Sequence, residues 1–214
     1  MAFVGPARVS SMAAWLEVRD GLANVRRLEL EGNVVGLVHE LESTTERGGR
    51  GQVRAQAALA LGRLGRPQAV PYLLPLTDDR SSHVRWAATY ALVQLQAPEA
   101  EDAFLRGLED DASLVRMSSA RGLGGLKANR AAPVLRRRLR SDEDAWVRVN
   151  SAEALAAIGD HSFADAIDGE LDRLDHLPWW RRKRGLRKHW LALREVAQTR
   201  DGGSNEASGT DKAD

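Results

Sequence analysis

A short motif of Val-Arg followed by alanines and leucines recurs four times in the central part of the chain. The Val-Arg pairs begin at Val53, Val84, Val115 and Val147, so the spacing is 31, 31 and 32 residues. A fixed period of this length predicts an array of stacked repeats, in which each unit buries its apolar face against its neighbours. No other feature of the sequence limits the fold as strongly.

The composition favours an all-α protein. Charged residues make up 29% of the 214 residues and aromatic residues only 5%, so strand signals are weak. The 31 basic and 30 acidic side chains give a formal charge of +1, so no global field draws the protein to nucleic acid or membranes. The chain has no cysteine and no apolar run of about 18 residues. We therefore expect a cytoplasmic protein without a signal peptide or membrane span.

Each repeat is predicted to be a helical hairpin whose second helix begins at Val-Arg. Apolar or small residues occupy offsets 0, 4, 5, 8 and 11 from the valine, which lie on one face of a helix. Small residues at offset 7 allow neighbouring helices to pack closely. The first helices of the hairpins are predicted at 68–76, 100–108 and 131–139, and Pro75 should kink or shorten the first of them. The loops before Val-Arg are acidic, and an aspartate there can cap the following helix.

The regions outside the repeats are assigned by composition and periodicity. We expect residues 1–48 to form N-terminal capping helices or a degenerate repeat, with helices at 12–30 and 34–42 and with Ser10 or Ser11 as the first N-cap. Residues 49–160 should hold four repeat units. Residues 161–198 should form a C-terminal cap of an acidic helix and then a basic helix ending near Gln198. Residues 199–214 lack apolar anchors and are predicted to be disordered.

The repeated motif resembles a known family. Val-Arg, Ala, Ala-Leu and Leu-Gly, at a period of about 31 residues after an acidic loop, are similar to the short bacterial HEAT repeat, the type also found in phycobilisome lyases. The resemblance covers residues 34–159 and implies a HEAT-like α-solenoid of stacked helical hairpins from a bacterium. It also implies that four arginines form a structural ladder with the loop aspartates: Arg54, Arg85, Arg116 and Arg148. Most members are scaffolds and a minority are enzymes, so fold alone does not assign a function.

The second helices of such a solenoid are expected to line a concave groove with offsets 2, 3, 6 and 10. Trp86, Tyr90, Met117 and Arg121 take these positions in adjacent repeats, and Asn150 and Glu153 take them in the fourth. Aromatic, Met and Arg side chains in a groove are typical of a protein-binding hot spot. The alternative is that Trp86 and Tyr90 fill the space between repeats. We interpret these six residues as the candidate partner-binding site.

A second candidate lies in the predicted basic helix. Its exposed face carries five residues suited to anions: Trp180, Arg181, Arg184, Arg187 and Lys188. Such a face can bind nucleic acid, an acidic protein or an anionic membrane surface. The alternative is that the acidic helix just before it neutralises these charges within the chain.

Catalytic motifs are absent from the sequence. The five histidines lack metal-ligand spacing, and no glycine-rich phosphate loop follows a strand. Acidic pairs recur at each repeat junction, which favours a structural role. We therefore predict a monomeric, non-enzymatic scaffold that binds an unidentified protein in its groove and needs no metal or cofactor. Two alternatives remain: a nucleic-acid binder, as in the HEAT-like DNA glycosylases, and a lyase or chaperone-like modifier of a partner protein.

Overall fold

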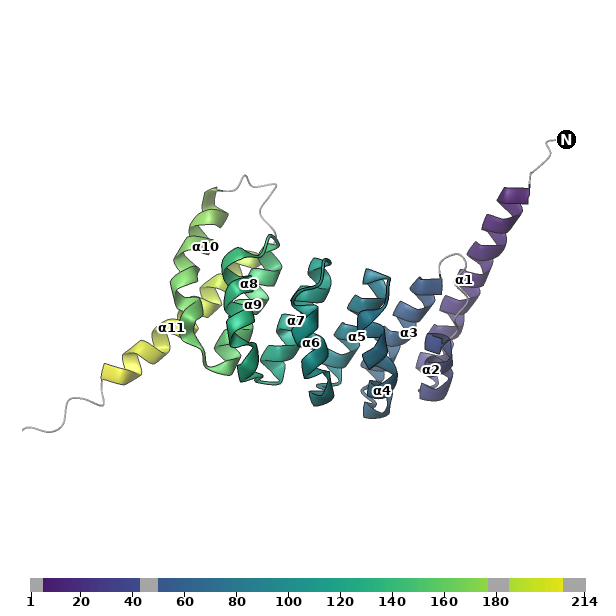
Figure 1. The fold of residues 1–214 in the computed structure, drawn as a ribbon, viewed down its shortest axis with the longest axis horizontal. Coiled ribbons are helices and arrows are strands. Elements are labelled where there is room, and N and C mark those ends of the chain that lie inside the picture. The colour runs from purple at the N-terminus through teal and green to yellow at the C-terminus, as the bar shows by residue number, and fades with distance from the viewer. Residues whose placement is uncertain (1–5, 43–49, 177–184, 206–214) are drawn as a thin grey trace, which may run out of the picture. The chain divides into compact units, whose positions relative to one another are not determined.

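A computed structural model describes residues 6–42, 50–176 and 185–205, which are helical with short connections (Figure 1). No strand occurs in these ranges, and the chain has the all-α fold of stacked helical hairpins, an α-solenoid. The elements in order are α1 (Pro6–Leu30), α2 (Val34–Glu42), α3 (Arg50–Leu64), η1 (Pro67–Ala69), α4 (Val70–Leu73), η2 (Leu74–Asp78), α5 (Ser82–Gln94), η3 (Pro98–Ala100), α6 (Glu101–Gly107), α7 (Ser113–Gly125), η4 (Asn129–Ala131), α8 (Ala132–Ser141), α9 (Ala145–Ile158), η5 (His161–Phe163), α10 (Ala164–His176) and α11 (Leu186–Asn205).

The chain divides into two compact units, Met1–Gly122 and Leu123–Asp214. In the first unit the helices follow one another in chain order (Figure 1). The second helices of the hairpins are buried at offsets 0, 4, 5 and 8: Val53, Ala57, Ala58 and Leu61 of α3 and Val84, Ala88, Thr89 and Leu92 of α5 are each at most 4% exposed. Offset 11, also predicted on this face, is only half-buried, as at Leu64 and Leu95. Burial of these stripes supplies the main stabilisation, because each hairpin alone would leave its apolar face in water.

The first helices of the hairpins are short, and each begins with one turn of 3₁₀ helix. Pro75 ends α4 as predicted, since α4 stops at Leu73 and the chain continues as the 3₁₀ turn η2. A proline at this position removes an N–H donor and its ring clashes with the preceding turn. Pro71 lies in the first turn of α4, where a missing N–H costs little.

Left-handed residues mark the ends of five helices at the repeat period. Positive φ angles occur at Gly32, Gly65, Gln96, Lys127 and Gly159, directly after α1, α3, α5, α7 and α9. Helices commonly end with such a residue, because its N–H can then bond a carbonyl of the last turn. Gly32 lies 33 residues before Gly65, so α1 has the register of a second helix.

The Gln96→Gly variant is expected to be more stable than wild type by about 0.5–1 kcal/mol. Gln96 has φ 49°, a conformation that costs an L-residue energy and glycine almost none. Urea unfolding followed by circular dichroism measures the change. The control is Gln94→Gly at the last residue of α5, where the backbone is helical and glycine should lower stability by up to about 1 kcal/mol. Equal destabilisation by both variants would show that the left-handed residue is not strained.

In the second unit, α8, α9, α10 and α11 pack together. Helix α11 buries one apolar face, on which Leu186, Trp190 and Leu193 are at most 5% exposed. Trp190 is the largest fully buried side chain of the described residues. The helix packs against both α9 and α10, so it belongs to the core of the unit.

Three boundary predictions were wrong. Helix α1 begins at Pro6 rather than near Met12, so Ser10 and Ser11 lie inside the helix and cannot be its N-cap. Helices α3, α5, α7 and α9 begin two or three residues before Val-Arg. Helix α11 ends at Asn205 rather than near Gln198, and so includes part of the segment expected to be disordered. Extending a formed helix costs less than nucleating one, which favours such run-on past weak helix formers. Residues 206–214 lie outside the described ranges.

Candidate functional site

The repeat arginines connect consecutive loops. Arg85 of α5 donates to Asp110 with Nε at 2.7 Å and Nη2 at 2.8 Å, and Nη2 also reaches Asp111 at 2.5 Å. Its Nη1 donates to the carbonyl oxygens of Asp79 and Arg80 in the loop before its own helix, at 3.0 and 3.3 Å. Arg85 therefore binds two acidic loops at once.

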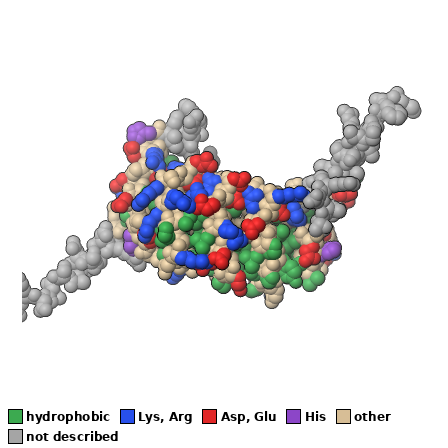
Figure 2. Space-filling view, viewed as in Figure 1, with side chains coloured by type: hydrophobic (Ala, Val, Ile, Leu, Met, Phe, Trp, Pro, Cys, Tyr) green, Lys and Arg blue, Asp and Glu red, His purple; other side chains and the backbone are tan. Residues whose placement is uncertain are grey.

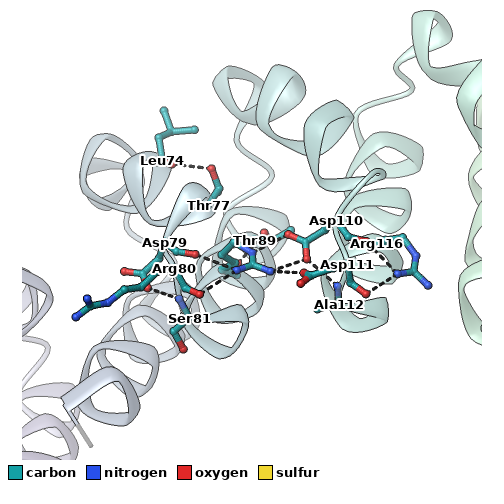
Figure 3. A network of polar contacts seen from close by, with 11 residues as sticks. Leu74, Thr77, Asp79, Arg80, Ser81, Thr89, Asp110, Asp111, Ala112 and Arg116 are labelled. Atoms are coloured by element: carbon teal, nitrogen blue, oxygen red, sulfur yellow. Dashed lines mark hydrogen bonds and ion pairs between the residues drawn. The ribbon is translucent and has the colours of Figure 1, made fainter. Parts of the chain in front are cut away.

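The other repeat arginines follow variants of this pattern. Arg54 pairs with Asp79 at 3.2 Å. Arg116, 4% exposed, donates to the carbonyl oxygens of Asp110 and Asp111 at 3.0 and 2.9 Å (Figure 3). Arg85 of α5 and Arg116 of α7 therefore both bind the loop that contains Asp110, which connects the first turns of the two helices.

Arg148 departs from the pattern in its carboxylate. It binds the carbonyl of Asp142 at 2.8 Å, but its acid partner is Glu170 of α10, with both bonds at 3.0 Å. Glu170 is 3% exposed and is also bound by Arg173. In this repeat the buried carboxylate that pairs with the arginine therefore lies in a helix, whereas Asp110, the partner of Arg85, lies in a loop.

The loop aspartates act mainly within their own loops. Asp79, Asp110 and Asp142 each accept a hydrogen bond from the backbone N–H two residues later, at 2.8–2.9 Å. This Asx turn sets the chain direction before the helix. Asp144 caps α9 with its side chain, accepting from the N–H of Trp146 at 2.7 Å. The prediction of aspartate caps holds there, whereas Ser81, the N-cap of α5, makes no such bond.

Side chains that leave the core form an accessible surface in the first unit, which we call the open face. It consists of nine exposed or half-exposed residues: Gln52, Gln56 and Arg63 of α3; His83, Trp86 and Tyr90 of α5; and Leu114, Met117 and Arg121 of α7. Offsets 2 and 3 do not belong to this face throughout. Ala55 and Ala87 are 0% exposed and Ser118 is 3% exposed, because these small residues pack inside the stack.

Aromatic rings form a continuous stripe along α5. The ring centroids of His83 and Trp86 are 5.4 Å apart and those of Trp86 and Tyr90 are 6.0 Å apart. Gln94 continues the stripe by donating to the Tyr90 hydroxyl at 3.1 Å. His83 and Gln94 are exposed, and Trp86 and Tyr90 are partly exposed, so the rings are not fully enclosed between repeats. Sequence reasoning missed His83 because it started the helix at Val84, although His83 lies three residues before Trp86.

A cavity of about 340 Å³ opens between α1 and α3, which pack against each other. Five of its seven lining residues are polar or charged, beside Leu22 and Val25: Arg26, Glu29, Gln52, Gln56 and Arg63. Arg63 binds Glu29 with Nε at 2.5 Å and Nη2 at 2.8 Å. This hydrogen bond lowers the pKa of Glu29 and raises that of Arg63, to which nearby Tyr90 adds an electrostatic contribution. Arg63 thus lies between the cavity and the aromatic stripe.

The candidate residues of the fourth repeat are engaged inside the second unit. Glu153 lies 2.6 Å from Nδ1 of His189 of α11, and the ring of His189 packs edge-on against Trp146 at 5.3 Å. The amide of Asn150 donates to the carbonyl of Trp146 at 2.8 Å. Both residues bond within their own unit, although the Glu153 side chain remains 41% exposed. The other four predicted residues belong to the first unit and are exposed or partly exposed: Trp86, Tyr90, Met117 and Arg121.

The predicted anion-binding helix is described only in part. Trp180, Arg181 and Arg184 lie outside the described residues. Arg187 pairs with Asp175 at 3.4 Å and Arg194 pairs with Asp168 at 2.9 Å, so α10 offsets part of the charge on α11. Lys188 is exposed.

Other surfaces show no chemistry of this kind. Figure 2 shows acidic and basic side chains interspersed, with hydrophobic side chains gathered over α2 and α4. A second cavity of about 330 Å³ beside Arg85 is lined by three arginines and three aspartates among other residues, so its charges balance. Among the residues that the structure describes, no group of His, Asp or Glu is arranged to hold a metal ion. No helix in the described ranges has the length and apolarity needed to cross a membrane.

Comparisons with known proteins agree with the fold. A family model described as HEAT repeats matches residues 38–124 and 101–186. The crystal structure of an engineered protein has 23% identity and a TM-score of 0.53, over 85% of this chain and 89% of that one. A designed armadillo repeat protein has 16% identity and a TM-score of 0.52, over 84% and 91%. The complex of CpcE and CpcF of phycocyanin lyase from Nostoc sp. has 22% identity over 85% and 89%, with a TM-score of only 0.42. No curated protein matches the chain significantly.

Proposed function

Because the chain belongs to the HEAT-repeat family, we propose that it is a non-enzymatic scaffold that binds a partner protein on the open face. The observation that carries this proposal is the stripe of His83, Trp86 and Tyr90, whose rings stay accessible on a buried helix. Rings of this kind, with a nearby Arg, provide most of the binding energy at protein interfaces. The fold would present them to a partner in the cytoplasm as a monomer.

The stripe is held in place before any partner arrives. The opposite side of α5 is buried, with Val84, Ala88 and Leu92 at 0% exposure. Arg85 joins the start of α5 to the loop before it and to the loop before α7. A rigid surface loses little conformational entropy when it binds, so more of the contact energy appears as affinity.

The other functions have less support. A nucleic-acid site on α11 would need free cations, and Arg187 and Arg194 are paired with α10. Lyase or glycosylase activity would need converging ionisable groups in a pocket. In the cavity beside Arg85, charged groups form ion pairs with one another instead, Arg85 with Asp110 and Arg106 with Asp78.

Covalent capture tests the proposal. A photo-crosslinking phenylalanine placed at Tyr90 should trap one protein partner in cells of the source organism, while the same group at Tyr72 should not. Tyr72 is the matched control, because it is also an exposed tyrosine of the first unit, 46% accessible, but lies on α4. The adduct should disappear when Trp86→Ala is added and should survive nuclease treatment. Equal trapping from both positions, or an adduct with nucleic acid, would refute partner binding on the open face.

A further inference from the structure

The open face has an excess of positive charge. Its nine residues include Arg63 and Arg121 and no carboxylate. Arg26 of α1 adds a third cation at the cavity, and Glu29 of α1 is the single acid among the cavity residues. The guanidinium of Arg121 makes no hydrogen bond or ion pair within the part of the chain that the structure describes, and Arg121 is exposed. A partner that supplies carboxylates could form ion pairs with these arginines.

The geometry at Arg63 suits a carboxylate. Its guanidinium already holds Glu29 through two parallel hydrogen bonds of 2.5 and 2.8 Å, the bidentate arrangement preferred by Arg–carboxylate pairs. Its side chain remains 49% exposed. The guanidinium carries five N–H donors in total, and the two bonds to Glu29 use only two. A second carboxylate at the cavity mouth could take donors that Glu29 leaves free.

Amide groups line the cavity next to these cations. The side-chain amides of Gln52 and Gln56 make no hydrogen bond within the described ranges, and both residues belong to the cavity lining. A glutamine amide offers two donors and one acceptor oxygen, which match the C=O and N–H groups of a peptide backbone. The cavity volume of about 340 Å³ is within the range of small-ligand sites and is sufficient for a side chain or a chain end.

From these features, we propose that the partner is recognised through a peptide segment that combines carboxylates with an aromatic ring. Its carboxylates pair with Arg63, Arg26 and Arg121, its backbone meets Gln52 and Gln56, and its ring stacks on Trp86 and Tyr90. This proposal rests on the proposed function and adds the chemistry of the partner. A single-stranded nucleic acid would also use rings and cations, but the unpaired amides and the small charge excess favour a peptide.

Defined polymers test the chemistry without knowledge of the partner. The probe is a fluorescein-labelled random copolymer of glutamate and tyrosine, titrated with the full chain and followed by fluorescence anisotropy. Poly-glutamate tests the need for the ring, a lysine–tyrosine copolymer tests the need for the carboxylate, and oligo-deoxythymidylate tests nucleic acid. We expect the glutamate–tyrosine copolymer to bind at least about tenfold more tightly than each of the others. Equal affinity for poly-glutamate, or tighter binding of the oligonucleotide, would overturn the proposal.

Matched variants locate the binding. Trp86→Ala should weaken binding of the glutamate–tyrosine copolymer by about tenfold or more, and Arg121→Gln by about threefold to tenfold. The controls are Tyr72→Ala on α4 and Arg140→Gln on α8, exposed residues outside the open face, and both should leave the affinity unchanged. If Arg140→Gln reduces binding as much as Arg121→Gln does, the copolymer senses general charge and the proposal fails. If Tyr90 still traps a partner in cells while the copolymer shows no preference, the acidic–aromatic chemistry fails and the proposed function stands.

Discussion

Replacement of Arg85 by alanine is expected to lower the free energy of unfolding by about 3 kcal/mol. The side chain of Arg85 is 15% exposed and that of its partner Asp110 is 10% exposed. The substitution removes both bonds to Asp110 and those to the carbonyls of Asp79 and Arg80. Its largest cost arises because a nearly buried carboxylate is left without its cation. Urea unfolding monitored by circular dichroism measures the loss.

Arg106→Ala is the matched control for Arg85→Ala. Arg106 pairs with Asp78 at 3.2 Å, but the two side chains are 57% and 65% exposed. An exposed pair of this kind contributes at most about 1 kcal/mol. Arg85→Lys should fall between the two, because lysine keeps the charge and loses the planar fork. A loss for Arg85→Ala no larger than that for Arg106→Ala would show that the ladder does not stabilise the stack.

The pH dependence of this variant follows from Asp110. Burial raises the pKa of Asp110, but hydrogen bonds from Arg85 and the amide of Ala112 outweigh burial and leave it below its ordinary value of 3.8. A lowered folded-state pKa gives stability that is present above 3.8 and is lost as the pH falls through the folded-state value. Wild type should therefore lose stability in acid below about pH 4. Arg85→Ala should lose less over that range, because burial then raises the pKa of Asp110.

The sequence predicted the buried face of the stack well. Offsets 0, 4, 5 and 8 of the repeat are buried in each second helix, as Val84, Ala88, Thr89 and Leu92 illustrate. Burial at these offsets follows from helix periodicity alone, and repetition removes the ambiguity of a single segment. The shortening of α4 was equally predictable, since Pro75 acts through its own covalent geometry.

The accessible surface was predicted less completely. Asn150 and Glu153 occupy the same offsets as Ser118 and Arg121, yet Glu153 contacts His189 of α11, because the C-terminal hairpin adds a helix beside α9. A periodic pattern cannot reveal such a neighbour from outside the repeat. The cavity at Arg63 was missed for a similar reason, since α1 supplies half of its wall. The offset of a residue in the repeat predicts whether it is buried. Its contacts at the ends of the stack depend on helices outside the repeat, here α1 and α11.

Gly62→Val is expected to lower the free energy of unfolding by about 3 kcal/mol. A Cβ atom at Gly62 of α3 would lie 2.8 Å from Cα and 2.9 Å from Cβ of Ala91 in α5, too close for either backbone to accept without moving. Gly51→Ala on the same helix should instead stabilise by up to about 1 kcal/mol. Its Cβ would lie 3.8 Å from Oγ of Ser81, an ordinary contact distance, and alanine favours the helix. Urea unfolding of both variants gives the two signs. Destabilisation of similar size at both positions would mean that the α3–α5 contact does not set the helix spacing. A loss at Gly62 with a gain at Gly51 would show that close contact between α3 and α5 sets the spacing of these helices. Arg63 lies on α3 and the aromatic stripe on α5, so the same spacing sets the distance between them.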